Sequence, residues 1–198
     1  MADPYLMAGD PGLEDSHELA VARSIIEAAD VDPDAEQHRR TILDFLDRHD
    51  DALHRSCRRG HLTGSALVVS ADGSRVVMLH HRKLQRWLQP GGHCDGDANL
   101  AAVGLREATE ETGLDGLRVA PVAIDLDVHE VRPPREDPHL HLDARFLVVA
   151  PEDAILAGNH ESTAIRWFAP DALADLDVDD GTLRMVRHGL ATLRRVRR

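Results

Sequence analysis

The sequence predicts an α+β fold in which a domain of strands and helices follows a helical N-terminal segment. Apolar residues recur at helical spacing before residue 58, and from Leu62 the pattern changes to extended β-branched and apolar runs. Two further helical patterns, over 100–112 and at the C-terminus, accompany these runs. With 198 residues, 42% of them hydrophobic, the chain can bury the core of one domain with an extension.

The N-terminal third predicts an arm and two helices. Residues 1–15 are rich in Gly, Pro and Asp, which is typical of a mobile arm. Residues 16–29 and 32–57 carry apolar residues at helical spacing. Pro33 separates them, because proline fixes its own φ and disfavours helix at the preceding residue. We therefore expect a helical extension over residues 16–60.

The remaining sequence predicts strands, beginning with a hairpin. Residues 62–70 and 75–81 are joined by an Asp-Gly pair that readily forms a tight turn. Later strands and helices follow in the order strand, strand, strand, short helix, terminal helix, over residues 117–131, 139–150, 164–168, 170–176 and 180–198.

Charge and cysteine content limit the function classes. Formal net charge is −12, from 23 basic and 35 acidic residues, which argues against long nucleic acid or an anionic membrane as the partner. An anionic substrate would need local cations, such as a metal. Cys57 and Cys94 suggest neither a disulfide framework nor a zinc knuckle, and no leader or membrane span is evident, so we expect a cytoplasmic protein. The N-terminal helices could cover the sheet, shape substrate access or form a homodimer.

One predicted helix carries an unusual cluster of acids. Asn99 can cap a helix over residues 100–112, and Gly113 can end it in the left-handed conformation. Glu107, Glu110 and Glu111 then share one face or its edge. Like charges at this spacing cost a few tenths of a kcal/mol per pair, so the cluster is unfavourable unless a cation binds it.

The stretch around these acids resembles the box of the Nudix, or MutT-like, hydrolase family. The pattern is a glycine, five residues, Glu, seven residues, then Arg-Glu-apolar-x-Glu-Glu-x-Gly-apolar. The matching residues are Gly92, Arg106, Glu107, Ala108, Glu110, Glu111, Gly113 and Leu114. "RWLQPGG" and "ESTAIRWF" extend the likeness over residues 62–170. The resemblance implies a Nudix fold, a mixed β-sheet sandwiched between helices, in a hydrolase domain over 61–198.

One position departs from that pattern, and one glycine is unexpected. The first glutamate should stand at position 98, where this chain has alanine. Asp95 or Asp97 could substitute, although a shorter side chain in a shifted position need not reach. Gly104 lies within the helix, where glycine costs about 1 kcal/mol relative to alanine, and we interpret it as a close contact with the sheet.

The resemblance implies a metal-dependent hydrolase that cleaves a diphosphate linkage in a small nucleotide or nucleoside-diphosphate derivative. Mg2+, or Mn2+, would be bound by Glu107 and Glu111, by Glu110 directly or through water, and by the backbone of Gly92. Arg106 would orient the carboxylates. The metal would activate the attacking water. Glu110 and Glu161, the latter on a later loop, are alternative general bases.

Several cations and histidines are candidates for substrate contact. Arg82, Lys83 and Arg86 lie just before the box and could meet phosphate or be solvated loop residues. Strand alternation places His139, His141 and Asp143 on one face.

These histidines have more than one possible role. With His93, or with His80 and His81, they could form a second metal site or a phosphate-binding patch. An ordinary polar sheet face is the alternative. We expect substrate contact from His93, His139 and His141, rather than a metal.

Two other functions fit parts of the pattern. An isoprenoid-diphosphate isomerase would explain the Gly-His pair at residues 92–93, but such enzymes carry a cysteine where this chain has Gly91. A non-catalytic ligand sensor would explain Ala98, but the residues after Phe168 are too few for a winged-helix DNA-binding segment.

Overall fold

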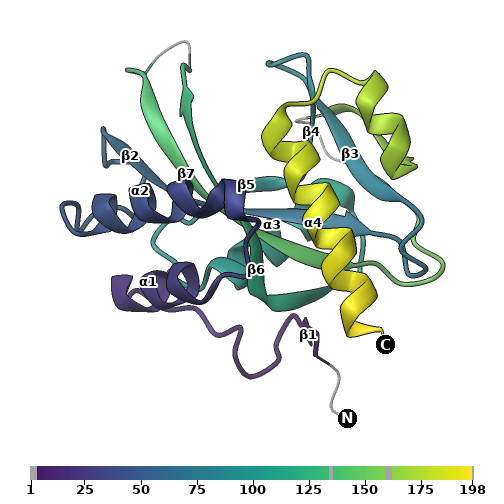
Figure 1. Cartoon of the computed structure of the whole chain (residues 1–198), viewed down its shortest axis with the longest axis horizontal. Helices are drawn as coiled ribbons and strands as arrows, with labels where there is room; N and C mark the ends of the chain where they lie inside the picture. Colours follow the sequence, from purple (N-terminus) through teal and green to yellow (C-terminus); the bar gives the residue numbers. More distant parts are fainter. Residues whose placement is uncertain (1–3, 134–135, 159–161, 198) are drawn as a thin grey trace.

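The computed structural model describes residues 4–133, 136–158 and 162–197. The helices are α1 Leu19–Ala28, α2 Glu36–Leu46, α3 Leu100–Thr112 and α4 Asp180–Val196, with 3-10 helices η1 Pro33–Ala35 and η2 Pro170–Asp175 (Figure 1). The strands are β1 Leu6–Met7, β2 Gly60–Val69, β3 Val76–His81, β4 Trp87–Leu88, β5 Gly91–His93, β6 Arg118–Val131, β7 His139–Val149 and β8 Ser162–Phe168.

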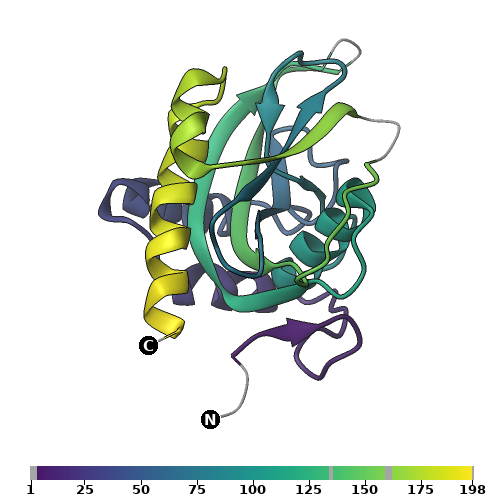
Figure 2. The same ribbon diagram turned by 90° about the vertical axis from the view of Figure 1, so that its right-hand side faces the viewer.

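The strands form one mixed sheet in the order β1-β6-β7-β2-β3-β4, with β5 paired to β2 and β8 to β3. Strand β2 pairs in parallel with β7 over the whole length of β2, from Gly60↔Leu140 to Val69↔Val149. The other pairings are antiparallel. Figure 2 shows α3 and α4 on opposite sides of the sheet, which confirms the predicted α+β sandwich.

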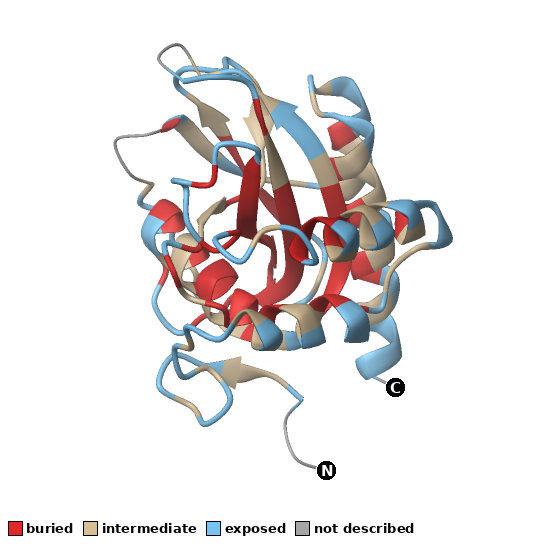
Figure 3. Cartoon of the chain, turned by 90° about the vertical axis from the view of Figure 1, so that its left-hand side faces the viewer, coloured by how far each residue is buried: buried red, intermediate tan, exposed pale blue. Residues whose placement is uncertain are grey.

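Alternation along β2 creates two cores. Ala66 and Val68 join a core with residues of α1, α2 and α3, whereas Leu67 and Val69 join a second core with residues of α4. Figure 3 shows the buried residues concentrated in the strands and on the inner faces of the helices. The N-terminal helices α1 and α2 therefore pack into the same core as α3. Among the described residues, no helix is both long and apolar enough to span a membrane.

Most predicted elements are confirmed, and the first hairpin is closed by Val69↔Val76 and by a hydrogen bond from Ser70 N to Arg75 O of 2.9 Å. Asn99 Oδ1 accepts from Ala102 N at 3.3 Å, and Gly113 ends α3 with φ 66°. These are the caps that the sequence predicted.

Two segments near the N-terminus differ from the expectation. The second helix ends at Leu46 instead of continuing to residue 57, because residues 47–57 turn back repeatedly to place Leu53 and Cys57 in the core. Residues 1–15 were expected to form a mobile arm, yet Leu6 and Met7 pair with β6. No sequence pattern predicted β4 and β5, which are only two and three residues long.

Candidate active site

The acidic face of α3 meets the short strand β5. Glu111 is buried, and its Oε2 accepts a hydrogen bond of 2.8 Å from the backbone N–H of Gly91. Glu107 is half-buried, and its Oε1 accepts a hydrogen bond of 3.0 Å from Arg106 Nη2. Glu110 is exposed. Two of the three carboxylates are thus fixed by the protein while the third faces solvent.

Arg106 and the glycines fix the position of β5 against the helix. Arg106 Nη2 also donates to His93 O at 2.9 Å, so one guanidinium connects the acid cluster to the strand. A Cβ added to Gly92 would lie 2.3 Å from Glu107 Oε2, and one added to Gly91 would lie 2.2 Å from Ser65 Oγ. A side chain at position 92 would therefore displace the Glu107 carboxylate, and one at position 91 would collide with Ser65, so glycine at both positions permits this close approach.

A second pair of glycines brings α3 close to the sheet. A Cβ on Gly104 would lie 3.1 Å from Ser65 O and 3.2 Å from a ring carbon of Phe146. Across the contact, a Cβ on Gly64 would lie 2.8 Å from Val103 Cγ1. The predicted close packing at Gly104 is confirmed, and it explains why the helix tolerates a weak helix former.

The surroundings of Glu107 in the acid cluster disfavour its negatively charged form. Burial raises the pKa of Glu107, and the nearby charges of Glu110 and Asp95 add to the effect, while Arg106 opposes it. Carboxylate oxygens and a nearby backbone carbonyl are the donors that Mg2+ and Mn2+ prefer. The donor set, and the glycine cradle that a Cβ would fill, therefore fit a hard divalent ion.

The missing glutamate of the box is replaced by a tightly packed alanine. Ala98 is fully buried. Asp97 Oδ1 accepts from the backbone N–H groups of Ser16 and Asn99 at 3.1 and 2.9 Å, and Asp95 binds Arg55 through two hydrogen bonds of 2.8 and 2.6 Å. Both aspartates thus serve to order the loop before α3.

A cavity of about 370 Å3 lies beside the acid cluster, between α3 and the N-terminal segment. Its lining includes Arg106 and Glu110 from the helix and Ala8 and Leu13 from the segment. Asn99 Nδ2 holds that segment in place by donating to the carbonyls of residues 12 and 14, each at 3.0 Å. The N-terminal residues therefore border the exposed side of the cluster.

The cations predicted to contact substrate have different environments. Arg82 and Lys83 are exposed at the turn after β3, and Arg82 Nη2 donates to Ser162 O at 3.4 Å. Arg86 is half-buried and pairs with Asp177 at 3.3 Å. Glu161, the alternative base, lies outside the described residues. Cys94 is buried and burial raises the pKa of its thiol, which is consistent with a packing residue.

The structure brings the three predicted histidines together and adds two more. The rings of His93, His139 and His141 lie 4.9, 4.9 and 5.0 Å from the ring of His61, and His129 lies 5.5 Å from His141. The sequence reasoning missed His61 and His129. Strand alternation places both on this face, but the pairing of β2 and β6 with β7 was needed to see it.

The other histidines considered lie apart from this cluster. His80 Nδ1 is 2.7 Å from Thr163 Oγ1, and His81 Nδ1 accepts from Leu84 N at 3.1 Å. Both are engaged on β3 or its turn, beyond β2 in the sheet.

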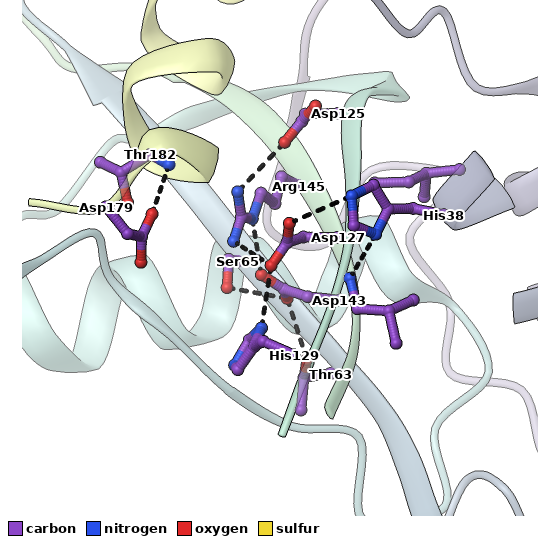
Figure 4. Close-up of polar contacts among 12 residues, drawn as sticks. His38, Thr63, Ser65, Asp125, Asp127, His129, Asp143, Arg145, Asp179 and Thr182 are labelled. Atoms are coloured by element: carbon purple, nitrogen blue, oxygen red, sulfur yellow. Dashed lines mark hydrogen bonds and ion pairs between the residues drawn. The ribbon is translucent and has the colours of Figure 1, made fainter. Parts of the chain in front are cut away.

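A buried ionic network continues along the same sheet face, and the sequence reasoning missed it as well. Arg145 is 2% exposed and binds Asp143, Asp125 and Asp127 at 2.8, 3.1 and 3.1 Å (Figure 4). Arg184 of α4 binds Asp125 and Asp127 at 2.9 and 3.1 Å.

The hydroxyls of β2 complete this network. Thr63 and Ser65 donate to Asp143 Oδ1, both at 2.9 Å. The network thus joins β2, β6 and β7 to α4, and its partners are all supplied by the protein.

The NUDIX domain family model matches residues 61–188. A relative from Mycobacterium tuberculosis named "Putative 8-oxo-dGTP diphosphatase 3" is 32% identical over 119 residues, 56% of this chain and 52% of that protein. Human "m7GpppN-mRNA hydrolase NUDT17" is 28% identical over 141 residues, 63% of this chain and 43% of that protein. The chain thus spans about half the length of the curated relatives it matches.

Solved structures share the fold at low identity. The dihydroneopterin triphosphate pyrophosphohydrolase of E. coli matches with a TM-score of 0.53 and 17% identity, over 66% of this chain and 95% of that one. The NUDIX domain of Shewanella oneidensis NrtR, complexed with ADP ribose, matches with a TM-score of 0.53 and 16% identity, over 76% and 97%. These likenesses establish the shared fold alone.

Proposed function

The chain belongs to the NUDIX domain family, and from this premise we propose that it is a metal-dependent pyrophosphohydrolase of small nucleotides or nucleoside-diphosphate derivatives. The observation that carries the proposal is the acid cluster on α3, where Glu107 and Glu111 are held against the glycines of β5. The names of the two sequence relatives, a diphosphatase for 8-oxo-dGTP and a hydrolase for m7GpppN-mRNA, support a nucleotide substrate.

The domain division follows from the same premise. We propose that the hydrolase domain occupies residues 61–198 and that residues 16–60 form a helical extension. The extension packs into the same core as α3, which favours a role in holding the acid cluster in place.

The residues that would hold the metal are Glu107 and Glu111, together with Glu110 and the carbonyl of Gly92. When bound, Mg2+ or Mn2+ supplies charge neutralisation of the diphosphate and lowers the pKa of the attacking water. The chain itself positions the donors. The N–H of Gly91 fixes Glu111, and Arg106 fixes Glu107 while it holds β5 in place.

The general base and the substrate contacts are further parts of the proposal. Glu110 is exposed beside the other acids and can accept a proton from water. Glu161, which lies outside the described residues, is the alternative base. Arg82 and Lys83 present exposed positive charge at the turn after β3, where a polyphosphate could be met. Arg86 would have to leave Asp177 to join them.

The test is hydrolysis of a panel of nucleoside triphosphates, dinucleotides and nucleotide sugars in the presence of Mg2+, with release of phosphate or pyrophosphate measured. We expect turnover of at least one member, and a loss of kcat/KM of about 100-fold or more in Glu111→Gln, because a carboxylate ligand is removed. Glu27→Gln, an exposed glutamate on α1, is the matched control and keeps wild-type turnover. Undiminished turnover in Glu111→Gln would contradict the ligand role.

The two candidate bases are separated by the pH dependence of kcat. Glu110→Gln and Glu161→Gln are compared with the wild type on the best substrate of the panel. Removal of the base abolishes the acidic limb of the pH profile, whereas removal of the other glutamate leaves that limb in place.

A further inference from the structure

The histidine cluster, defined as His61, His93, His129, His139 and His141, lies on four neighbouring strands. His141 of β7 is directly opposite His61 of β2 and His129 of β6, and His93 of β5 is opposite Thr63, two residues along from His61. Because alternate residues of a strand share a face, the strand order places all five imidazoles on one side of the sheet.

This side is distinct from the one that carries the acid cluster. Gly92, which meets Glu107, is opposite Gly64, and Gly64 packs against α3. His93 is the next residue after Gly92 and its side chain therefore projects from the other face. The two groups of ligand-type residues thus occupy opposite faces of β2 and β5.

Three of the five histidines have converging nitrogens. One ring nitrogen from each of His61, His139 and His141 lies within 4.8 Å of the other two. Zinc bound to imidazoles at about 2.0–2.1 Å in tetrahedral geometry holds its ligand nitrogens about 3.4 Å apart. Small side-chain rotations would therefore be enough to bring these three nitrogens onto one ion.

His61 supplies an independent observation that points to a ligand. The residue is only 2% exposed, and neither ring nitrogen has a hydrogen-bond partner among the residues that the structure describes. The carbonyl of Cys57 lies close enough to oppose the fall in its pKa, but not in hydrogen-bonding geometry. A buried polar group without a partner costs about 1–3 kcal/mol, so the fold keeps this imidazole at an energetic cost that a bound cation would remove.

The neighbouring groups are arranged as metal ligands usually are. His139 Nδ1 lies 2.9 Å from the carbonyl of Asp137, which fixes the proton on that nitrogen and leaves Nε2 with its lone pair.

We propose that His61, His139 and His141 form a binding site for a divalent transition-metal ion of the zinc type, with His93 within reach of the fourth position. Imidazole nitrogens favour Zn2+ and its neighbours over Mg2+, so this ion differs from that of the acid cluster. The half-buried position of His141 leaves the site open toward solvent.

The test uses the full chain without a polyhistidine tag, stripped of metal by a chelator and titrated with Zn2+ and with Co2+. We expect one ion per chain with the visible absorption of tetrahedral Co2+. His61→Gln and His141→Gln lower the affinity about 100-fold or more, because each removes a direct ligand. The second variant changes a partly exposed residue, so the site remains testable where the buried substitution prevents folding. Circular dichroism checks the fold of each.

Two controls separate this site from other sources of metal binding. His80→Gln makes the same substitution outside the cluster and keeps the Co2+ absorption. The double variant Glu107→Gln and Glu111→Gln also keeps it, whereas that variant loses Mg2+-dependent hydrolysis, so failure of the proposed hydrolase and failure of the zinc site are distinguishable. The proposal is overturned if the wild type takes up no Zn2+, or if His61→Gln and His141→Gln bind it as tightly as the wild type.

Discussion

Two groups of carboxylates in this protein differ in how their negative charge is balanced. Asp125, Asp127 and Asp143 on β6 and β7 are bound by Arg145 and Arg184, which the chain supplies from β7 and α4. The acid cluster on α3 has the same number of carboxylates, and the guanidinium that binds there is that of Arg106, which contacts Glu107.

This difference helps to distinguish carboxylates that stabilise the fold from carboxylates that bind a ligand. In the network, each carboxylate is buried with a cation, because an unpaired buried charge would cost several kcal/mol. In the acid cluster, the protein leaves negative charge at a place where backbone glycines and solvent meet. Under the proposed function, a divalent cation from solution balances this charge, as at a binding site.

The largest expected effect is on the network. Arg145→Met leaves three carboxylates without their shared guanidinium, and we expect the free energy of unfolding to fall by about 3–5 kcal/mol. Urea denaturation followed by circular dichroism measures the change. A loss below about 1 kcal/mol would show that the network is no more structural than the acid cluster.

The second effect concerns the acid cluster and the metal. Mg2+ at about one hundred times its dissociation constant should raise the free energy of unfolding of the wild type by about 2.7 kcal/mol. Glu107→Gln removes most of this gain, because the negative charge and one of the two carboxylate oxygens are lost. Thermal melts with and without Mg2+ compare the two proteins. An equal Mg2+ shift in the variant would place the ion elsewhere.

The third effect is a pH dependence within the network. Burial would raise the pKa of Asp127, but His129, Arg145 and Arg184 outweigh it and hold that pKa well below its usual range. His38 also faces Asp127, at 3.8 Å. A lowered carboxyl pKa gives stability that is present above the unfolded pKa of about 3.9 and is lost as the pH falls.

The hydrogen bond between Asp127 and His129 shifts the pKa of His129 upward, opposite to the shift at Asp127. Burial would lower the pKa of His129, yet the Asp127 carboxylate raises it. The stability that His129 contributes is present below its unfolded pKa of about 6.5 and is lost as the pH rises through its folded pKa. The pair therefore stabilises most between about pH 4 and pH 6.5.

Unfolding at several pH values tests this pair. We expect the wild type to lose stability below pH 4 with a slope that approaches 1.4 kcal/mol per pH unit, or about one proton, and Asp127→Asn to flatten it. An unchanged acid slope in Asp127→Asn would assign the loss to other carboxylates.

The smallest effect is expected at an exposed ion pair. Arg86→Met breaks the contact with Asp177, whose side chain is 73% exposed, and should change the free energy of unfolding by about 0–1 kcal/mol. The same substitution type as Arg145→Met makes this the matched control for the network. If Arg86 also meets substrate phosphate, KM rises while kcat stays unchanged, and steady-state kinetics would detect it.

Much of the fold was predictable because it depends on local patterns. The limits of α3 follow from Asn99 and Gly113, whose caps act within a few residues, and the first hairpin follows from its Asp-Gly turn. The second helix was predicted too long, because its apolar spacing continues through residues that turn instead to fill the core. The strands β1, β4 and β5 are too short for alternation to reveal.

The candidate sites divide in the same way. Glu107, Glu110 and Glu111 lie within five residues of one helix, so their spacing alone predicts a common face. His61 and His141 are 80 residues apart and meet only because β2 runs parallel to β7. Arg184 reaches Asp125 and Asp127 only because α4 crosses the same face.

The sequence by itself determined the helix that carries the acids, the glycines beside it, the acidic charge of the chain and its family likeness. All of these depend on residue type and on separations of a few turns, where covalent connection dictates what is near. The tertiary structure decided which acids are neutralised by arginines, where the N-terminal residues lie and which histidines converge. Those features depend on strand pairing and burial. Strand pairing brings together residues that are distant in the chain, and burial changes the free energy of each charged group.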